Sequence, residues 1–470
     1  MTGDNWDVIV LGAGAAGLTA ARAARARGAE KVALIERDRL GGECTHVGCI
    51  PSKALIHAAG LAQSAREHPE VLRPPEVDFP AVMARVHEVI AHVAQDESEE
   101  VMEAAGITVL TGDARFTGTH TIDVDGAGHR FRKAVVATGS EAVVPGFLAD
   151  GPVPVLTNET IFGLTDRPRH LIVVGGGPIG VELGQAFARL GSAVTIVERD
   201  PRLLPLLDAD AAATLTGRLA AEGVTIRTGC SVTGTVREGG ADLVELDDGS
   251  SLETDALLIA VGRRPRLDGL GLEEAGVTTD PAGIVTDDRM RTSALHIYAA
   301  GDVTRGGGFT HIAAHQGRVA GENAAGVRAK ADLRVSPAVT FTDPEIASVG
   351  LTPDQARDEH RGVEVVDFPM AGVDRARTRG RTDGFVRIVT ARRRLLGRAG
   401  GGQVVGGTVV GDGAGELIHE IALAMQTRMF AGRLAQTIHA YPSASMAVQQ
   451  AAGQLFPIGR ALAGDAPDEA

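Results

Sequence analysis

Three observations predict an α/β fold. A pattern of apolar strand, glycine-rich turn, helix and strand occurs twice in the 470 residues, first over 8–36 and again over 171–198. The wide spacing of the two copies indicates duplication of a domain, not a short repeat. From Pro337 onward, apolar runs precede helical periodicity, which predicts a separate α+β domain. We therefore expect two Rossmann-like nucleotide-binding domains followed by a C-terminal α+β domain.

The first copy has the pattern of a dinucleotide-binding loop. The apolar run Val8–Leu11 leads into Gly12, Gly14 and Gly17, a helix follows, and a second apolar run ends at Glu36. The first glycine permits a tight turn, the second lets the backbone approach a pyrophosphate, and the third lets helix and strand pack closely. The helix N-terminus then faces the phosphates, and Glu36 can accept a hydrogen bond from a ribose hydroxyl.

The second copy repeats every part of this pattern. The run Leu171–Val174 leads into Gly175, Gly177 and Gly180, and the next apolar run ends at Glu198. Two dinucleotide sites in one chain indicate two cofactors that exchange electrons.

Two cysteines follow the first copy closely. Cys44 and Cys49 are separated by four residues, and Pro51 suits the first turn of a helix. Cys49 then lies near a helix N-terminus, where the dipole favours a thiolate. Such a pair can cycle between disulfide and dithiol. The spacing does not fit a zinc site, so we expect no metal, and Cys230 is interpreted as structural.

The rest of the chain is less specific. Residues 53–106 are predicted to be largely helical, and 107–137 to form a small antiparallel element that ends before Thr138 and Gly139. We place domain boundaries near residues 150, 270 and 335.

Composition narrows the class of protein further. Charged residues make up 23% of the chain, and 46 basic against 60 acidic residues give a net charge of −14. An acidic chain is a poor candidate for binding nucleic acid or an anionic membrane. No apolar run reaches the ~18 residues of a transmembrane helix, and the N-terminus lacks the features of a signal peptide. We expect a cytoplasmic protein with neither nucleic acid nor membrane as a partner.

Together these segments resemble the FAD-dependent pyridine nucleotide–disulfide oxidoreductases, among them lipoamide dehydrogenase, glutathione reductase and mercuric reductase. The resemblance covers about residues 6–460 and rests on five separated motifs in the family's order. It implies an FAD domain at 1–150 and 271–335, an NAD(P)-binding domain at 151–270, and a dimerisation domain at 336–470. A homodimer that acts on a small-molecule electron acceptor is implied as well.

The resemblance also implies which residues hold the cofactors. FAD would be bound by Gly12, Gly14, Gly17, Glu36, Gly42, Lys53, Thr138, Gly139, Gly301 and Asp302. NADH or NADPH would be bound by Gly175, Gly177, Gly180, Glu198 and Gly262. We expect NADH to be preferred, because the Glu198 carboxylate would repel the extra phosphate of NADPH; Arg199 and Arg202, directly afterwards, are the opposing evidence.

The implied mechanism passes a hydride from the nicotinamide to the flavin and then electrons to a Cys44–Cys49 disulfide. Cys49 would become the thiolate in charge-transfer contact with the flavin, and Cys44 the interchange thiol that meets the substrate. Lys53 resembles the lysine near flavin N5, and Glu182 resembles its ion-pair partner.

The C-terminal segment departs from the family pattern. Disulfide-reducing members carry His-x-His-Pro-Thr with a glutamate four residues after the proline, where this chain has Tyr441 for the second histidine and Met446 for the glutamate. A phenol with a pKa of about 10 is a poor base at neutral pH, and His439 and His46 are alternative bases. The acceptor therefore stays open. It is a disulfide reduced by the cysteines or a quinone reduced directly by the flavin, and a low-turnover redox sensor is the alternative from another class.

Overall fold

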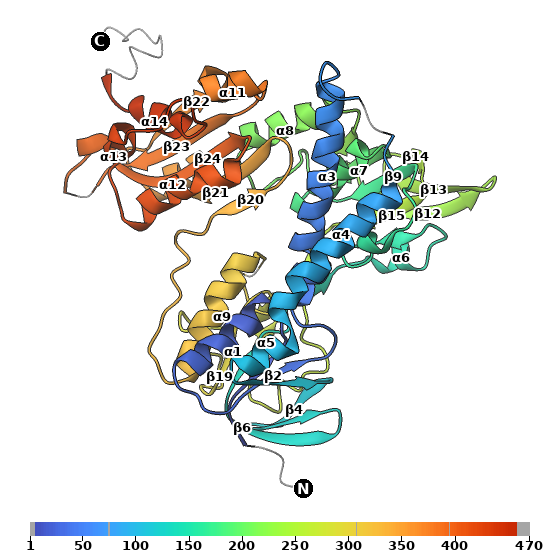
Figure 1. The fold of residues 1–470 in the computed structure, drawn as a ribbon, viewed down its shortest axis with the longest axis vertical. Helices are drawn as coiled ribbons and strands as arrows, with labels where there is room; N and C mark the ends of the chain where they lie inside the picture. The colour runs from blue at the N-terminus through green and yellow to red at the C-terminus, as the bar shows by residue number, and fades with distance from the viewer. Residues whose placement is uncertain (1–4, 74–75, 307, 394, 458–470) are drawn as a thin grey trace. The chain divides into compact units, whose positions relative to one another are not determined.

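The computed structural model describes residues 5–73, 76–306, 308–393 and 395–457 (Figure 1). The chain divides into two compact units. Unit 1 comprises Met1–Ala58, Pro75–Arg167 and Ala256–Leu333, and unit 2 comprises Ala59–Pro74, Pro168–Asp255 and Arg334–Ala470. Unit 1 thus holds the first glycine loop and both clustered cysteines, and unit 2 holds the second glycine loop. The finer division into three domains stays a prediction.

The main sheet of unit 1 has the strand order β3-β2-β1-β6-β5-β4, and β19 pairs with β6. Its strands are β1 (Asn5–Leu11), β2 (Val32–Glu36), β3 (Ile107–Thr111), β4 (Ala114–Gly118), β5 (Thr121–Val124), β6 (Ala127–Val136) and β19 (Ile297–Ala299). β1 is central and parallel to both neighbours, which explains its continuous apolar run. β4, β5 and β6 pair antiparallel as predicted.

One part of the predicted antiparallel element was wrong. β3 pairs with β2 in parallel, with Ile107 opposite Val32. The chain reaches β3 from a helical segment, and such a crossover returns the next strand parallel to an earlier one.

The helices of unit 1 carry the candidate site, and the first, the fifth and the last of them contact the strands of this sheet. They are α1 (Ala15–Ala26), α2 (Gly42–His46), the first part of α3 (Cys49–Glu67), α4 (Phe79–Ala94), α5 (Glu99–Ala104), α6 (Gly146–Ala149) and α9 (Thr310–Ala324). Helices α1 and α9 lie side by side (Figure 1). A Cβ at Gly317 would stand 2.1 Å from the carbonyl oxygen of Ala16, so this contact requires glycine.

Short elements complete unit 1. β7 (Ser140–Ala142) pairs with β16 (Arg263–Pro265), β8 (Val155–Leu156) with β15 (Ala256–Ile259), and β17 (Thr279–Asp280) with β18 (Gly283–Ile284); the 3₁₀ helices are η1 (Gln95–Glu97) and η2 (Ile161–Gly163). The β7–β16 pair places Ser140 near Arg263, which matters for the site below.

Unit 2 begins with the second strand–loop–helix pattern. β9 (His170–Val174), α7 (Pro178–Arg189), β10 (Ala193–Glu198), α8 (Ala209–Ala221) and β11 (Thr225–Thr228) follow one another, and then β12 (Val232–Glu238), β13 (Ala241–Leu246) and β14 (Ser251–Glu253). β10 pairs in parallel with both β9 and β11. The three last strands form a separate antiparallel sheet.

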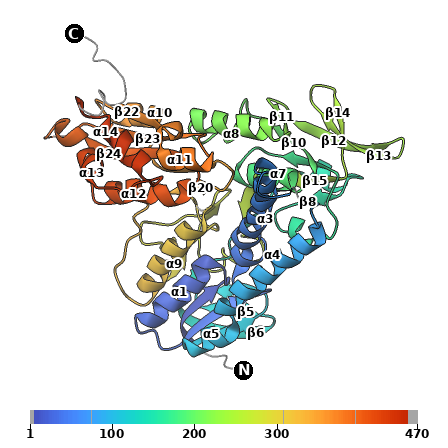
Figure 2. The same ribbon diagram turned by 45° about the horizontal axis from the view of Figure 1, so that its top comes forward.

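The C-terminal part of unit 2 is an antiparallel sheet of order β20-β21-β24-β23-β22 with helices packed on it (Figure 2). The strands are β20 (Ala338–Thr340), β21 (Glu345–Gly350), β22 (Glu364–Pro369), β23 (Phe385–Ala391) and β24 (Gln403–Gly411). The helices are α10 (Pro353–Glu359), α11 (Asp374–Arg379), α12 (Ala414–Gln426), α13 (Ala431–Gln436) and α14 (Met446–Gly453), with 3₁₀ helices η3 (Met370–Gly372) and η4 (Ala399–Gly401). This is the α+β domain that the sequence predicted, and its core joins α12 to β24 and α14 to β23.

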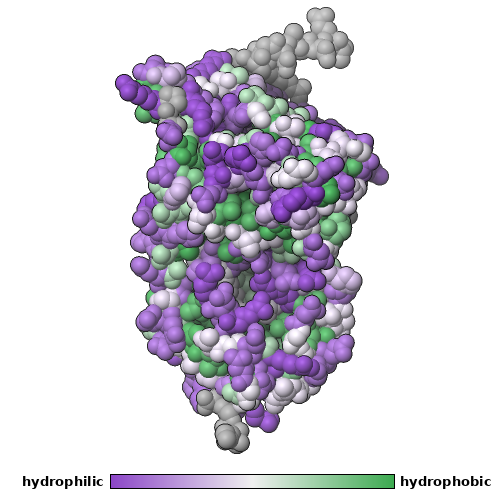
Figure 3. Space-filling model, turned by 90° about the vertical axis from the view of Figure 1, so that its right-hand side faces the viewer, coloured by the Kyte–Doolittle hydropathy of each residue, from purple (hydrophilic) through white to green (hydrophobic). Residues whose placement is uncertain are grey.

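Across the described residues, no helix combines the length and the apolar character that crossing a membrane requires. On the face drawn in Figure 3, hydrophilic side chains predominate and apolar ones occur in small groups.

Candidate redox site

The first glycine loop has the geometry that a dinucleotide requires. Gly12 has a φ of +91°, and a Cβ there would stand 2.4 Å from the carbonyl oxygen of Ala137. A Cβ at Gly17 would lie 1.7 Å from the Gly12 oxygen, so helix and strand could not pack as they do. Gly14 is the N-cap of α1 and gives no side-chain cap, and a Cβ there would stand 4.0 Å from the Cα of Gly42. The first amides of α1 therefore face a cradle that suits a pyrophosphate.

The second loop in unit 2 repeats this geometry. Gly175 has a φ of +108°, and a Cβ at Gly180 would lie 2.0 Å from the Gly175 oxygen. Gly177 is the N-cap of α7 without a side-chain cap and has open space beside it. Both loops thus fit a dinucleotide for the same physical reasons.

Strands β2 and β10 each end in a glutamate, and hydrogen bonds from the preceding glycine loop hold the carboxylate of that glutamate in place. Glu36 Oε2 accepts a hydrogen bond from the amide of Ala13 at 2.8 Å, and its Oε1 accepts from the amides of Arg37 and Asp38 at 2.9 and 3.0 Å. Glu198 Oε2 accepts one from the amide of Gly176 at 2.6 Å, and its Oε1 accepts one from Asp200 at 2.8 Å. Because a carboxylate has about four acceptor positions, these contacts fix its direction and leave room for ribose hydroxyls.

The two arginines after Glu198 differ. Arg202 donates hydrogen bonds to the carbonyls of Leu204, Pro205 and Leu207 at 2.7–2.9 Å. Its guanidinium is thus used to close its own turn. Arg199 is exposed.

Four more of the predicted FAD residues, Thr138, Gly139, Gly301 and Asp302, lie at the carboxyl ends of β6 and β19. The Asp302 carboxylate accepts hydrogen bonds from Ser140 Oγ at 3.1 Å and from the Gly308 amide at 2.8 Å. Gly301, with a φ of +80°, donates its amide to Gln316. Thr138 Oγ1 donates to the Arg266 carbonyl at 3.0 Å, and the neighbouring Gly139 has a φ of +70° and open space beside it. Nucleotides bind at this edge of an open parallel sheet.

The clustered cysteines meet at a residue that the sequence did not predict. Cys44 lies in α2, Cys49 begins α3, and both are half-buried thiols. The hydroxyl oxygen of Thr310, at the start of α9, lies 3.3 Å from each sulfur. A hydrogen bond to Cys49 and burial raise the pKa of Cys44, while the bond from Thr310 acts in the opposite direction. No local signal marks Thr310, because 261 residues separate it from Cys49.

A second contact missed by the sequence lies next to Cys44. The Glu43 carboxylate pairs with Arg263 and accepts a hydrogen bond from Asn158 at 2.7 Å. Arg263 Nε also donates to Ser140 Oγ at 2.9 Å, so this network reaches the residue that donates to Asp302. Burial raises the pKa of Glu43 although Arg263 opposes the shift.

The predicted pair of Lys53 and Glu182 involves both units. Lys53 is half-buried on the first turns of α3 in unit 1. Glu182 lies on α7 in unit 2, where its buried carboxylate accepts a hydrogen bond from the Phe341 amide at 2.8 Å. Their ion pair stays a prediction. Gly262, with a φ of +140°, directly precedes β16.

The residues of the C-terminal motif that differs from the family pattern lie in unit 2. Tyr441 is 70% exposed, and its hydroxyl donates to Asp374 at 3.1 Å. That hydrogen bond to a carboxylate raises the phenol pKa, which keeps Tyr441 protonated. Met446 begins α14. His439 Nε2 lies 3.0 Å from the Glu420 carboxylate. In the sequence it stands two residues before Tyr441, which occupies the position of the family's base.

The remaining candidates, His46 and Cys230, contact only other parts of the protein in the described structure. His46 Nε2 lies 2.7 Å from the Leu40 carbonyl. Cys230 is buried, and burial raises the pKa of its thiol. No group of three or more His, Cys, Asp or Glu side chains in the described part of the chain could hold a metal ion.

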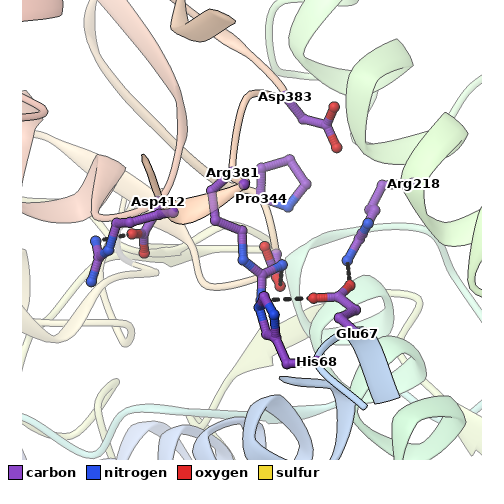
Figure 4. Close-up of a pocket in the computed structure, with 10 residues that line it drawn as sticks. Glu67, His68, Arg218, Pro344, Arg381, Asp383 and Asp412 are labelled. Carbon is purple, nitrogen blue, oxygen red and sulfur yellow. Dashed lines mark hydrogen bonds and ion pairs between the residues drawn. The ribbon is translucent and has the colours of Figure 1, made fainter. Parts of the chain in front are cut away.

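Unit 2 also contains a charged cavity of about 290 Å³. Arg218 and Arg381 approach Glu67 from two sides there, and Asp412 and Asp383 line the rim (Figure 4). None of the predicted cofactor or cysteine residues lines it.

Two dinucleotide cradles and a thiol pair define an oxidoreductase that uses two nucleotide cofactors. The chain belongs to the pyridine nucleotide-disulphide oxidoreductases: the model of that family matches residues 6–317, and the model of the family's dimerisation domain matches residues 336–452. It is an enzyme that uses FAD and NAD(P)H.

The relatives include two kinds of enzyme. The chain is 38% identical over 467 residues to the dihydrolipoyl dehydrogenase of Thermus scotoductus, covering 96% of this chain and 97% of that protein. It is 33% identical to a mercuric reductase of Bacillus cereus, covering 93% of this chain and 69% of that protein.

Solved structures show the same fold. LpdA from Mycobacterium tuberculosis matches with a TM-score of 0.87 and 32% identity, covering 97% of this chain and 100% of that chain. The HOCl-induced flavoprotein disulfide reductase RclA from Escherichia coli matches with a TM-score of 0.83 and 30% identity, covering 95% and 99%.

Proposed function

We propose that the enzyme passes electrons from NADH through FAD to Cys44 and Cys49, and from there to a small disulfide. The observation that carries this proposal is the Thr310 hydroxyl at 3.3 Å from both sulfurs. Two thiols held this way can exchange with a disulfide bond. FAD, when bound, accepts the hydride and supplies the electron pair to the thiol side.

The protein's residues have three tasks in this proposal. The first glycine loop and Asp302 bind and orient FAD, and the second glycine loop orients NADH. Lys53 and Glu182 are the charged residues that the family's motifs assign to hydride transfer. Cys49 would be the thiolate next to the flavin, and Cys44 would attack the acceptor.

We propose NADH as the nicotinamide cofactor. Glu198 has a fixed direction at the strand end because its carboxylate accepts hydrogen bonds from Gly176 and Asp200. Arg202 closes its own turn, which leaves exposed Arg199 as the residue that could hold the phosphate of NADPH.

A second candidate acceptor is a quinone, which takes electrons directly from the flavin. The observation that favours it is Tyr441, whose hydroxyl is bonded to Asp374 and whose raised pKa makes it a poor base. A disulfide with acidic leaving thiols also needs little help from a base, so both acceptors are consistent with this tyrosine.

We also propose a homodimer, because the chain carries the family's dimerisation domain at residues 336–452. In the family, the C-terminal segment of one subunit completes the site of the other. The cytoplasmic setting expected from the sequence stays a prediction.

The test compares Cys44→Ser with the matched control Cys230→Ser, using NADH and three acceptors: lipoamide, DTNB and menadione. Loss of disulfide reduction with menadione reduction retained supports a thiol route. Full disulfide reduction by Cys44→Ser would overturn the proposal. Absence of NADH oxidation by the wild type with every acceptor would favour the redox-sensor alternative.

A further inference from the structure

One hydroxyl is shared by both redox sulfurs. Thr310 Oγ1 donates to Cys44 Sγ at 3.3 Å and lies 3.3 Å from Cys49 Sγ, a contact in which either atom can be the donor. A threonine hydroxyl carries one proton and two acceptor lone pairs. It can therefore donate to one sulfur while it accepts from the other.

This arrangement matches a dithiol that has lost one proton. In that state one sulfur is a thiolate, which only accepts, and the other is a thiol, which can donate. The chain thiol–hydroxyl–thiolate is then fully satisfied, and turning the hydroxyl round satisfies the opposite assignment equally well.

We propose that Thr310 is a catalytic residue that relays a proton between Cys44 and Cys49 and so generates the Cys44 nucleophile. This inference rests on the proposed function. It assigns to Thr310 the deprotonation of the interchange thiol, which a C-terminal histidine performs in the family. Tyr441 stands where the family has a histidine base, and its hydroxyl is committed to Asp374.

The relay conserves atoms and charge. The Cys44 thiol gives its proton to the Thr310 oxygen, and the Thr310 proton moves to the Cys49 thiolate, which leaves Cys44 as the thiolate. Cys44 then attacks one sulfur of the acceptor disulfide, forms a mixed disulfide and releases the first product thiolate, which takes a proton from water.

The second half returns the site to its oxidised form. Cys49 returns its proton through Thr310 to the second leaving sulfur and attacks Cys44. The Cys44–Cys49 disulfide forms, the mixed disulfide breaks, and the acceptor has gained two electrons from the dithiol.

Among the described contacts, Thr310 is the polar side chain that lies within hydrogen-bond distance of both sulfurs. Burial and the bond to Cys49 raise the pKa of the Cys44 thiol, and Thr310 counters that shift. Other titratable groups nearby on α2 and α9 are Glu43, His46 and His311. Glu43 pairs with Arg263, His46 is bonded to a backbone carbonyl, and His311 is exposed.

The test uses Thr310→Val, which keeps the shape and removes the hydroxyl, and Thr310→Ser, which keeps the hydroxyl. Each holoenzyme is reduced with NADH without oxygen. The rate of Cys44 alkylation by iodoacetamide is followed against pH by mass spectrometry of the cysteine peptide. Steady-state rates with lipoamide and menadione are measured in parallel. If the valine variant binds less flavin, Thr310→Ala replaces it.

We expect Thr310→Val to move the alkylation midpoint to higher pH and to slow lipoamide reduction roughly 10- to 100-fold, the size of one hydrogen bond to a charged group. Menadione reduction should be slowed less than lipoamide reduction, and Thr310→Ser should stay within about threefold of the wild type in each assay. An alkylation profile of Thr310→Val equal to that of the wild type would overturn the relay.

This outcome is separate from failure of the proposed function. If Cys44→Ser keeps its disulfide reductase activity, the thiol route is wrong, whereas the pH profile of the Thr310 variants still reports directly on the thiols.

Discussion

At the scale of single residues, backbone amides fix the orientation of the carboxylate at the end of a strand. Glu36 and Glu198 lie at equivalent places in the two loops, and each accepts a hydrogen bond from an amide of its own glycine turn. Backbone amides cannot swing away as arginine side chains can. The direction of each strand-end carboxylate is therefore a property of the fold.

A first prediction concerns this charge. Glu198→Gln keeps the shape and removes the repulsion toward a ribose phosphate, so we expect the ratio of kcat/KM for NADPH over NADH to rise about tenfold, equivalent to about 1.4 kcal/mol. Both constants are measured at the same ionic strength. Arg199→Ala is the control and should move the ratio the other way or not at all. A wild type that already prefers NADPH tenfold would contradict the assignment of Glu198.

A second prediction concerns Tyr441. Because its hydroxyl is bonded to Asp374 and its pKa is raised, Tyr441→Phe should slow disulfide reduction less than about threefold. The double variant Tyr441→His, Met446→Glu restores the family's pair and should accelerate lipoamide reduction, since general base catalysis contributes about 10²–10⁴-fold. Steady-state assays across neutral pH test both variants. A hundredfold loss in Tyr441→Phe would show that the phenol itself acts in turnover.

At the scale of elements, ion pairs join separate helices within unit 2. Arg189 on α7 pairs with Glu222 just after α8 at 2.5 Å and with Asp343 before β21 at 2.8 Å. Arg218 on α8 pairs with the same Glu222 and with Glu67 at the end of α3. The side chains of Arg189 and Glu222 are only 4% and 5% exposed, so water solvates neither charge and both depend on their ion pairs.

A third prediction follows from that burial. Arg189→Ala removes one basic partner of the buried Glu222 and leaves Arg218 as another, so we expect a loss of about 3 kcal/mol in the free energy of unfolding, the lower end of the cost of breaking a buried pair. Arg357→Ala removes an exposed pair with Asp354 and should cost at most about 1 kcal/mol. Urea unfolding followed by circular dichroism compares them. Equal stability of the two variants would contradict a structural role for the buried pair.

The elements around the site were predictable where the signal was local. Glycine spacing between an apolar run and a helix located both dinucleotide loops, because the turn, the phosphate approach and the helix packing each exclude larger residues. The start of α3 at Cys49 followed from Pro51. β3 was misassigned, since alternation within Ile107–Thr111 does not tell which neighbour a strand will pair with.

The contacts that complete the site were not predictable. Thr310 reaches the cysteines, and Arg263 reaches Glu43, only after distant segments of unit 1 come together. Neither residue belongs to a pattern with its partner in the sequence. The roles given to Cys44, Cys49, Lys53 and Glu182 come from the family's motifs and stay predictions.

At the scale of the whole molecule, a dimerisation domain follows the nucleotide-binding part of the chain. We expect light scattering to give twice the monomer mass of 48.6 kDa and the purified protein to be yellow with bound FAD. A monomer at micromolar concentration would contradict the homodimer. A folded preparation that stays colourless with added FAD would contradict the assignment of the first loop.

The central claim is that one electron pair resides on the flavin and a second on Cys44 and Cys49. Anaerobic reductive titration of the holoenzyme measures this directly. We predict that the wild type takes up two electron pairs per subunit, that the first gives a long-wavelength charge-transfer absorbance, and that Cys49→Ser takes up one pair without that absorbance. Uptake of a single pair by the wild type, or persistence of the band in Cys49→Ser, would contradict the account.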